Sequence, residues 1–417
     1  MLNVNNYFNI KTSHKYIIAG KLKTSNVSTN CDNLNIPERY STNLQIYPKP
    51  FILTFSSNTQ INKNLSTKID EAFSTEDASE FIRYTNRHLP TIKNIPPVIT
   101  EENKENKDFP VSLIQINNKK PSLNNKISVD KHGHIQIAEN GEKLFITKEE
   151  LIKSGTMDEE AAHIIGNGIR GFDPGNQDDW VKTKLGKTWP TSPDTRDLNG
   201  VARPFVDKKN KAILFTSPNT VGENYGVNPR GIAAINPDSS VIIAYQQTNN
   251  NPEIDFSAWS IAPFKVPEGK KAIAIFPNNN EENLSDINNN LKWSIKDDLI
   301  LLNPSKDGDM AGFISKKADW AIFAVEGSDK AYLMRSIYNG KDSNQDKFKA
   351  FCLGGENSNY LELEFMSPRV KQNEKSTIAY KIEPVFLSNY GLTEFSAEKI
   401  EDESIDLANK IKQKIQK

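Results

Sequence analysis

The sequence predicts a mainly β protein: an antiparallel β-sandwich preceded by a polar arm and followed by a helix. Between about residues 166 and 390, many short apolar or alternating segments are separated by clusters of turn residues, without long helical patterns between them. Strands at this density are typical of a sandwich. All five tryptophans lie in this part, whereas the first 125 residues are rich in Asn, Ser, Thr, Lys and Pro.

Length and composition exclude several classes of protein. The chain has 417 residues, enough for two or three domains, and its formal net charge of -1 argues against a protein that wraps nucleic acid. Its two cysteines, Cys31 and Cys352, are far apart and have no companion ligands at zinc-site spacing. We therefore expect neither a disulfide scaffold nor a structural zinc site.

No targeting segment is recognisable. The first 21 residues contain no apolar run of signal-peptide length, and no stretch of the chain approaches 18 consecutive apolar residues. We expect a soluble protein without a membrane span, either cytoplasmic or exported by a route that needs no signal peptide.

The polar composition of residues 1–125 predicts a partly disordered arm, because such segments bury too little apolar surface to offset the entropy of the chain. Two local exceptions stand out. Residues 47–57 offer one short strand, and residues 74–89 predict a helix with Ser74 or Thr75 as its N-cap, ended by Pro90.

Residues 126–165 predict a small connector. Two alternating runs flank Asn140-Gly141, a pair that supplies the positive φ values of a type I′ hairpin turn. A capped helix follows, with Thr147 as N-cap and Gly155 as its end, and a second short helix is expected within residues 157–165.

Nine segments illustrate the strands expected in the sandwich: 211–217, 239–248, 256–266, 270–277, 298–303, 320–327, 330–338, 360–368 and 375–386. After them, residues 391–417 carry apolar side chains near helical spacing and predict an amphipathic C-terminal helix. Its polar face mixes both charge signs, which favours packing on the sandwich over a membrane or partner role.

Enzyme motifs that cradle phosphates, bind zinc or form a serine nucleophile elbow do not occur, and we expect no cofactor and no metal. The histidines are His14, His88, His132, His134 and His163. None lies within the β-rich part, which excludes a Ser-His-Asp or histidine-ligated metal site formed wholly there. His132 and His134 would share one face of a strand, a geometry that a metal could use, but a solvated hairpin face is the simpler interpretation.

The segment Tyr360–Phe365 alternates, so Glu362 and Glu364 share one face of a strand and the apolar residues share the other. Two interpretations are open. The glutamates could simply face water, or they could line a cleft and supply a carboxylate for binding sugar hydroxyls or for general base catalysis.

Trp259 and Trp189 are open to two interpretations as well. Large aromatic side chains usually anchor a core. Trp189, however, lies in a Gly-, Pro- and Ser-rich loop near Asp194 and Arg196, and loops on a rigid sandwich often carry ligand contacts. An indole face against the C–H side of a pyranose, surrounded by polar groups, suits sugar recognition.

The order of these segments resembles a bacterial family of the galactose mutarotase-like, or aldose 1-epimerase-like, superfamily. The similar stretches cover about half the chain: 186–196, 212–232, 241–277, 312–337 and 357–384. They include a Trp-Pro loop, a Gly-containing strand that ends near Arg230, an Ala-Trp strand and the paired-glutamate strand. The resemblance implies a large antiparallel β super-sandwich over residues 166–390.

The resemblance also implies sugar chemistry. In related epimerases a carboxylate removes the proton of the anomeric hydroxyl while a histidine protonates the ring oxygen; Glu364, or else Glu362, matches that base. The residues implied to bind substrate are Trp189, Asp194, Arg196, Arg230 and Trp259. No histidine matches the acid, for which Asp194, Tyr225 and Lys317 are candidates.

Three functions remain open at the level of the sequence. The protein could be a sugar mutarotase or epimerase, a carbohydrate-binding protein without turnover, or an interaction protein such as an exported effector that contacts a protein partner through its N-terminal arm. The resemblance favours the first two, with a sugar or sugar-containing ligand as partner.

Overall fold

The computed structural model describes residues 16–18, 51–53, 58–92, 125–130, 133–155, 162, 167–174, 203–216, 227–252, 255, 257–278, 285–286, 293–303, 310–337, 347–353 and 360–415. The chain divides into two compact units, Met1–Ile61 and Asn62–Lys417. Within the first unit, β1 (Tyr16–Ile18) pairs antiparallel with β2 (Phe51–Leu53), the short strand predicted in residues 47–57.

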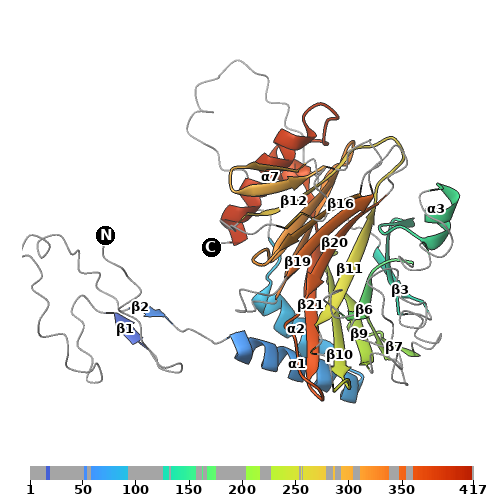
Figure 1. Ribbon diagram of the computed structural model, residues 1–417, viewed down its shortest axis with the longest axis vertical. Helices are drawn as coiled ribbons and strands as arrows, with labels where there is room; N and C mark the ends of the chain where they lie inside the picture. Colours follow the sequence, from blue (N-terminus) through green and yellow to red (C-terminus); the bar gives the residue numbers. More distant parts are fainter. Residues whose placement is uncertain are drawn as a thin grey trace, which may run out of the picture. The chain divides into compact units, whose positions relative to one another are not determined.

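The second unit contains two large antiparallel sheets (Figure 1). The ten-stranded sheet has the order β14 (Trp293–Lys296), β15 (Leu299–Leu302), β12 (Ala272–Pro277), β17 (Trp320–Val325), β18 (Lys330–Ser336), β21 (Lys375–Phe386), β10 (Val241–Asn249), β9 (Val227–Ile235), β8 (Ala212–Thr216) and β7 (Arg203–Asp207). The six-stranded sheet has the order β13 (Ser285–Asp286), β16 (Met310–Ser315), β19 (Phe348–Leu353), β20 (Tyr360–Met366), β11 (Ala258–Lys265) and β6 (Arg170–Pro174).

The largest apolar core includes side chains from both sheets, which confirms the predicted antiparallel sandwich. Leu361, Leu363 and Phe365, the apolar face of β20, belong to this core. Phe264 of β11 stacks on Phe323 of β17 with ring centroids 4.7 Å apart and so joins the two sheets. The alternation read from the sequence therefore has its usual cause: every second side chain of a strand points into the core.

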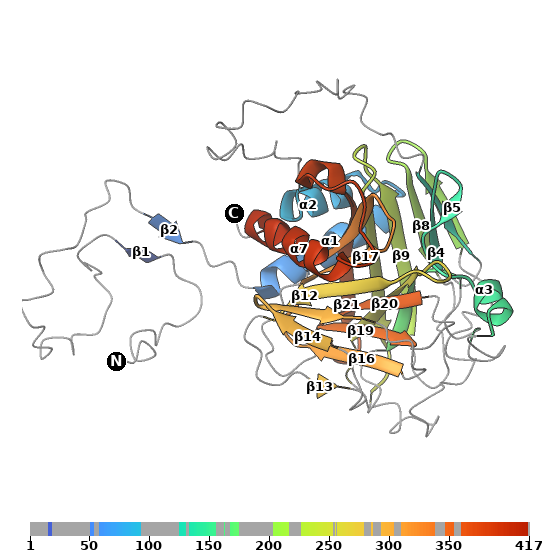
Figure 2. The same cartoon turned by 90° about the horizontal axis from the view of Figure 1, so that it is seen from above.

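Three helices cover the other face of the ten-stranded sheet (Figure 2). α7 (Ile400–Ile415) packs over β12, β15 and β17 and confirms the predicted C-terminal helix; a short 3-10 turn, Leu387–Tyr390, precedes it. α1 (Asn58–Thr75) and α2 (Ser79–His88) pack over β8, β9 and β10. Burial on both faces explains why β12 is apolar throughout.

The helices α1 and α2 correct one sequence-based expectation. Ser74 and Thr75 do not cap a helix; they end α1, where both hydroxyls donate to the carbonyl oxygen of Glu71. The chain turns at Glu76, whose φ is +55°, and α2 begins after Ala78. Part of the predicted arm is thus packed against the sheet.

A small three-stranded sheet and a helix fill residues 125–155. β4 (Ile135–Glu139) pairs with β3 (Asn125–Val129) and β5 (Glu142–Lys143). The predicted turn is confirmed, because Asn140 and Gly141 have φ values of +52° and +95°. α3 (Lys148–Lys153) is confirmed as well, with a capping box between Thr147 and Glu150. Of the expected second helix, only Ala162 is described.

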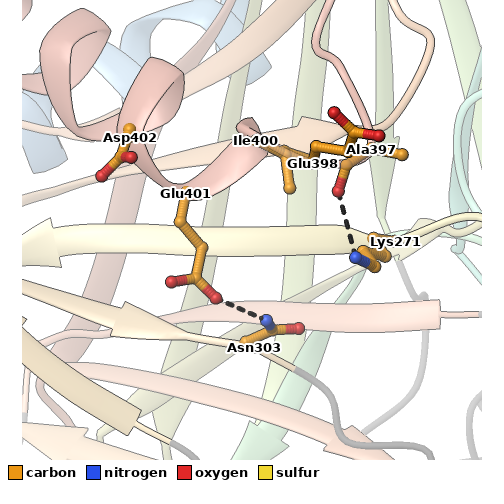
Figure 3. Close-up of a pocket in the computed structure, with 7 residues that line it drawn as sticks. All are labelled: Lys271, Asn303, Ala397, Glu398, Ile400, Glu401 and Asp402. Atoms are coloured by element: carbon orange, nitrogen blue, oxygen red, sulfur yellow. Dashed lines mark hydrogen bonds between the residues drawn. The ribbon is translucent and has the colours of Figure 1, made fainter.

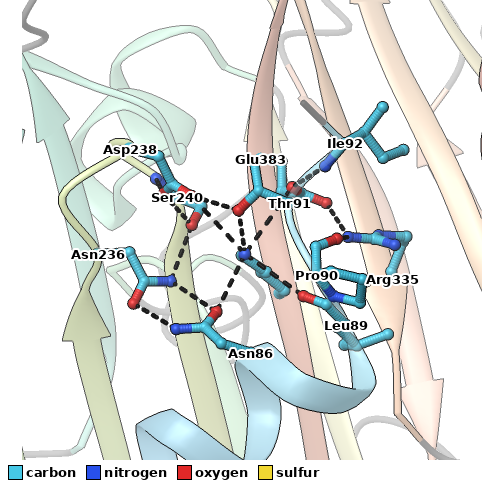
Figure 4. A network of polar contacts seen from close by, with 11 residues as sticks. Asn86, Leu89, Pro90, Thr91, Ile92, Asn236, Asp238, Ser240, Arg335 and Glu383 are labelled. Carbon is cyan, nitrogen blue, oxygen red and sulfur yellow. Dashed lines mark hydrogen bonds and ion pairs between the residues drawn. The ribbon is translucent and has the colours of Figure 1, made fainter. Parts of the chain in front are cut away.

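A buried polar network fastens the end of α2 to the sheet (Figure 4). The Lys381 Nζ donates to Asn86 Oδ1 at 3.1 Å, to the Leu89 carbonyl oxygen at 3.4 Å and to Thr91 Oγ1 at 2.6 Å. It therefore binds the carbonyl end of α2, where the helix dipole favours a cation. Beside it, the Arg335 guanidinium pairs with the Glu383 carboxylate.

Burial shifts both charged groups at the centre of this network. Burial lowers the pKa of Lys381, although Glu383 and Asp238 oppose the shift. Burial raises the pKa of Glu383, although Arg335 and Lys381 oppose that shift. Each group thus depends on its charged neighbours to remain ionised in a buried environment that excludes water.

Residues 1–57 are expected to be dispensable for the stability of the second unit, whereas α1 and α2 are not. Deleting residues 1–57 leaves every residue of the unit Asn62–Lys417 in place, so the free energy of unfolding of this unit should not change. Phe81→Ala should lower the free energy of unfolding by about 3–5 kcal/mol, because the side chain is fully buried between α2 and the sheet. Urea unfolding measures both. A deletion as damaging as the point substitution would contradict this division.

Lys381→Met is expected to destabilise the protein in a pH-dependent manner. At neutral pH it should cost about 3–5 kcal/mol, because the Glu383 charge loses a partner. The pKa of Glu383 is already raised and rises further without the ammonium, so the variant loses stability as pH increases through that pKa. Urea unfolding at mildly acidic pH should therefore show a smaller cost. An equal cost at both pH values would mean that the Glu383 charge is not what Lys381 compensates.

Candidate functional site

Charged residues and a tryptophan share one face of the six-stranded sheet. Because β20 alternates, Glu362 and Glu364 lie on the side opposite to its core-facing leucines. The register places Lys349 of β19 and Ile261 of β11 directly opposite Glu364 on either side. Arg170 of β6 is in turn the partner of Ile261. We call the side chains of Arg170, Trp259, Lys349, Glu362 and Glu364 the glutamate face.

Glu364 is held by Trp259. The indole Nε1 donates to a Glu364 carboxylate oxygen at 2.6 Å. The Lys349 Nζ lies 4.8 Å from the centroid of the same indole ring, a cation–π arrangement. Trp259 and Glu364 are each 3% exposed and Lys349 is 8% exposed. One indole therefore contacts a carboxylate with its edge and an ammonium with its face.

Glu362 has a different neighbour. Its carboxylate lies 4.0 Å from the Arg170 guanidinium, and both side chains are almost completely buried. Two acidic and two basic side chains thus stand on the same face, so their formal charges cancel. In surroundings that exclude water, these interactions are stronger than they would be at the surface.

The connector covers one end of the glutamate face. Tyr360, at the start of β20, packs in a small apolar cluster with Phe351, Ile146 and Leu151 of α3. The sequence alternation puts Tyr360 on the same side as the two glutamates. The stretch predicted as a connector therefore also shields this end of the site from water.

The residues predicted to form the site fall into three groups. Glu362, Glu364 and Trp259 lie together on the glutamate face. Trp189, Asp194, Arg196 and Tyr225 lie outside the described residues. Arg230 and Lys317 are described but do not belong to the glutamate face.

Arg230 lies on β9 of the ten-stranded sheet and faces α1. Its guanidinium donates to Gln246 at 2.6 Å, forms an ion pair with Asp70 of α1 and stacks over the Phe73 ring. These contacts attach a helix to the sheet. Arg230 is thus engaged away from the glutamate face.

Sequence reasoning missed Arg170 and Lys349. Both lie in strands, but only the pairing register shows that they share a face with Glu364. Of the two histidines predicted to share a strand face, only His134 is described: its Nδ1 lies 3.0 Å from Asp130 Oδ2, whereas His132 lies outside the described residues. Within the described ranges, no three His, Cys, Asp or Glu side chains are grouped as metal ligands would be.

A pocket of about 260 Å³ lies at the start of α7 (Figure 3). It is lined mostly by charged and polar residues that already bind one another: Lys271 Nζ donates to the Ala397 carbonyl oxygen at 3.0 Å, and Asn303 donates to Glu401 at 3.0 Å. These contacts attach α7 to the sheet. None of the glutamate-face residues lines this pocket, and we do not regard it as the functional site.

Among the described residues, no helix is both long and apolar enough to cross a membrane. No protein-family model and no curated protein matches the chain.

Solved structures with a similar fold include two aldose 1-epimerase candidates. One is a putative aldose 1-epimerase from Escherichia coli K12, at 11% identity and TM-score 0.40, covering 63% of this chain and 96% of that one. Another, from Klebsiella pneumoniae, has 10% identity and TM-score 0.43 and covers 67% and 80%. Heparan sulfate lyase HepC from Pedobacter heparinus has 9% identity and TM-score 0.29, over 61% of this chain but 30% of the lyase.

The bond between Trp259 and Glu364 is expected to be energetically specific. In a double-mutant cycle, Trp259→Phe and Glu364→Gln should show a coupling energy of about 1.5–3 kcal/mol, the range for hydrogen bonds to charged groups. Urea unfolding of the two single variants and the double variant measures it. Trp259→Phe with Glu362→Gln is the matched control and should be additive within about 0.5 kcal/mol. Equal coupling in both cycles would contradict the observed pairing.

Proposed function

We propose that the glutamate face binds a sugar and that Glu364 removes the proton of its anomeric hydroxyl. The observation that carries the proposal is the bond between Trp259 Nε1 and Glu364, made on a face that also holds Glu362, Arg170 and Lys349. This combination suits sugar binding: the indole can contact the C–H side of a pyranose, and the fixed charged groups can bind the hydroxyls of the sugar. The structural similarity to putative aldose 1-epimerases agrees with the sequence resemblance.

We assign the base to Glu364 rather than Glu362 because Glu364 binds the indole that would hold the sugar. Glu362 lies instead 4.0 Å from the Arg170 guanidinium. The Trp259 Nε1–H donates to the Glu364 carboxylate and orients it. Fixing a base in place before the substrate arrives is a main source of catalytic rate.

Burial has a consequence for access. Glu362 and Glu364 are only 4% and 3% exposed, so a sugar can reach them only when part of the cover moves. Once the sugar is bound, the same exclusion of water would strengthen its hydrogen bonds to the carboxylates. We therefore expect the sugar to enter slowly, after a local movement, and not through an open cleft.

A carbohydrate-binding protein without turnover is the second candidate. It is favoured by the absence of any histidine after His163, which leaves the acid of related epimerases without a counterpart. The same tryptophan and charged groups would then hold a sugar without opening its ring. A protein partner for residues 1–125, and with it a role as an exported interaction protein, stays a prediction.

Sugar binding is expected to raise the melting temperature, because a ligand that binds only the folded state stabilises it by mass action. A panel of aldohexoses and their 6-phosphates provides the probes. Arg230→Met is the control: it should lower the melting temperature by loosening α1 yet keep the rise caused by the sugar. No rise with any sugar would count against both carbohydrate functions.

Catalysis is tested by NMR exchange between the α and β anomers of a sugar that binds. Glu364→Gln should lower the exchange rate by about 10²–10⁴-fold while the melting-temperature rise persists. Glu362→Gln should have a smaller effect on exchange. If the wild-type protein binds the sugar but does not accelerate anomer exchange, the carbohydrate-binding function is supported and the enzymatic function is contradicted.

A further inference from the structure

Lys349 lies directly opposite Glu364 on the neighbouring strand of the six-stranded sheet. The two residues are direct partners in the antiparallel pair β19–β20, so their side chains emerge on the same face about 5 Å apart at Cβ. The Lys349 Nζ lies over the Trp259 ring, and that ring's Nε1 donates to Glu364. An ammonium and a carboxylate therefore flank one indole.

Such a position is unusual for a lysine. Lysine side chains are almost never buried unless something compensates the charge, and Lys349 is only 8% exposed. The face of the Trp259 ring offers partial compensation, since the π-electrons attract a cation. All the same, an indole face does not accept a proton, so the ammonium keeps its protons available for a ligand.

Ring opening of an aldose has a strict spatial requirement. The proton to be removed is on the hydroxyl at C1, and the proton to be added goes to the ring oxygen, which is bonded to the same carbon. The base and the acid must therefore approach two neighbouring atoms. A directly opposed cross-strand pair such as Lys349 and Glu364 meets this requirement without any rearrangement of the sheet.

Other possible donors near the site are less suitable. Arg170 cannot give up a proton near neutral pH. Tyr360 is fully buried in the apolar cluster under α3. Lys317 lies in the bend that follows β16, beyond the paired strands. Of the described residues on the glutamate face, Lys349 alone combines a transferable proton with a position opposite Glu364.

We infer that Lys349 is the general acid that replaces the missing histidine, an inference that rests on the proposed function. Glu364 takes the proton of the C1 hydroxyl, the C1–O5 bond breaks as the C1 carbonyl forms, and O5 takes a proton from the Lys349 ammonium. After rotation about C1–C2, O5 attacks the other face of C1. The O5 proton returns to the Lys349 amine, and the carbonyl oxygen recovers its proton from Glu364.

The test compares Lys349→Arg with Lys349→Met, using α/β anomer exchange of D-glucose and D-galactose by NMR and the melting-temperature rise caused by the same sugars. Both variants should bind, and both should lower exchange by about 10²–10⁴-fold. Arginine keeps the positive charge and the contact with Trp259 but cannot donate a proton, so it separates proton transfer from a purely electrostatic role.

Three outcomes decide the matter. Near-wild-type exchange in Lys349→Arg would overturn the inference, since charge alone would then suffice. Near-wild-type exchange in Lys349→Met would overturn the inference as well. In that case, a loss of exchange in Glu364→Gln would still support the proposed function. Wild-type protein without any exchange activity would instead overturn the proposed enzymatic function and this inference together. If Lys349→Met does not fold, the arginine variant still decides.

Discussion

The alternation along β20 is the constraint on which both the core and the site depend. One set of side chains, Leu361, Leu363 and Phe365, enters the main core, and the other set carries Glu362 and Glu364. A shift of one residue in the pairing with β11 or β19 would bury two carboxylates between the sheets, at a cost of several kcal/mol each. The core therefore fixes the register, and the register fixes which side chains meet on the glutamate face.

The ten-stranded sheet imposes a second requirement, because its other face is apolar and must also be covered. The cover comes from both ends of the second unit: α7 from the C-terminal end, and α1 and α2 from the N-terminal end. Polar contacts fix the latter pair, with Arg230 binding Asp70 of α1 and Lys381 binding the end of α2. The helices thus stabilise a sheet that supports the site from behind without contributing to it.

How far the sequence predicts this structure depends on whether each feature is local. The strands, the Asn140-Gly141 turn and α7 follow from patterns within a few residues and are confirmed. α1 was missed, although Leu65, Ile69 and Ala72 recur at helical spacing, because its Asn- and Thr-rich sequence has low helix propensity. The roles of Arg230 and Lys349 depend on pairing between distant strands, which no local pattern specifies.

The two buried groups of charges differ in what they hold together. The Lys381 network links α2 to the sheet, so its charges have a structural task. The glutamate face, by contrast, lies on β6, β11, β19 and β20, neighbouring strands that backbone hydrogen bonds already join. Buried ion pairs contribute little stability compared with apolar residues of similar volume. Because backbone pairing already joins the strands that carry these charges, we favour a role for them in binding a polar ligand.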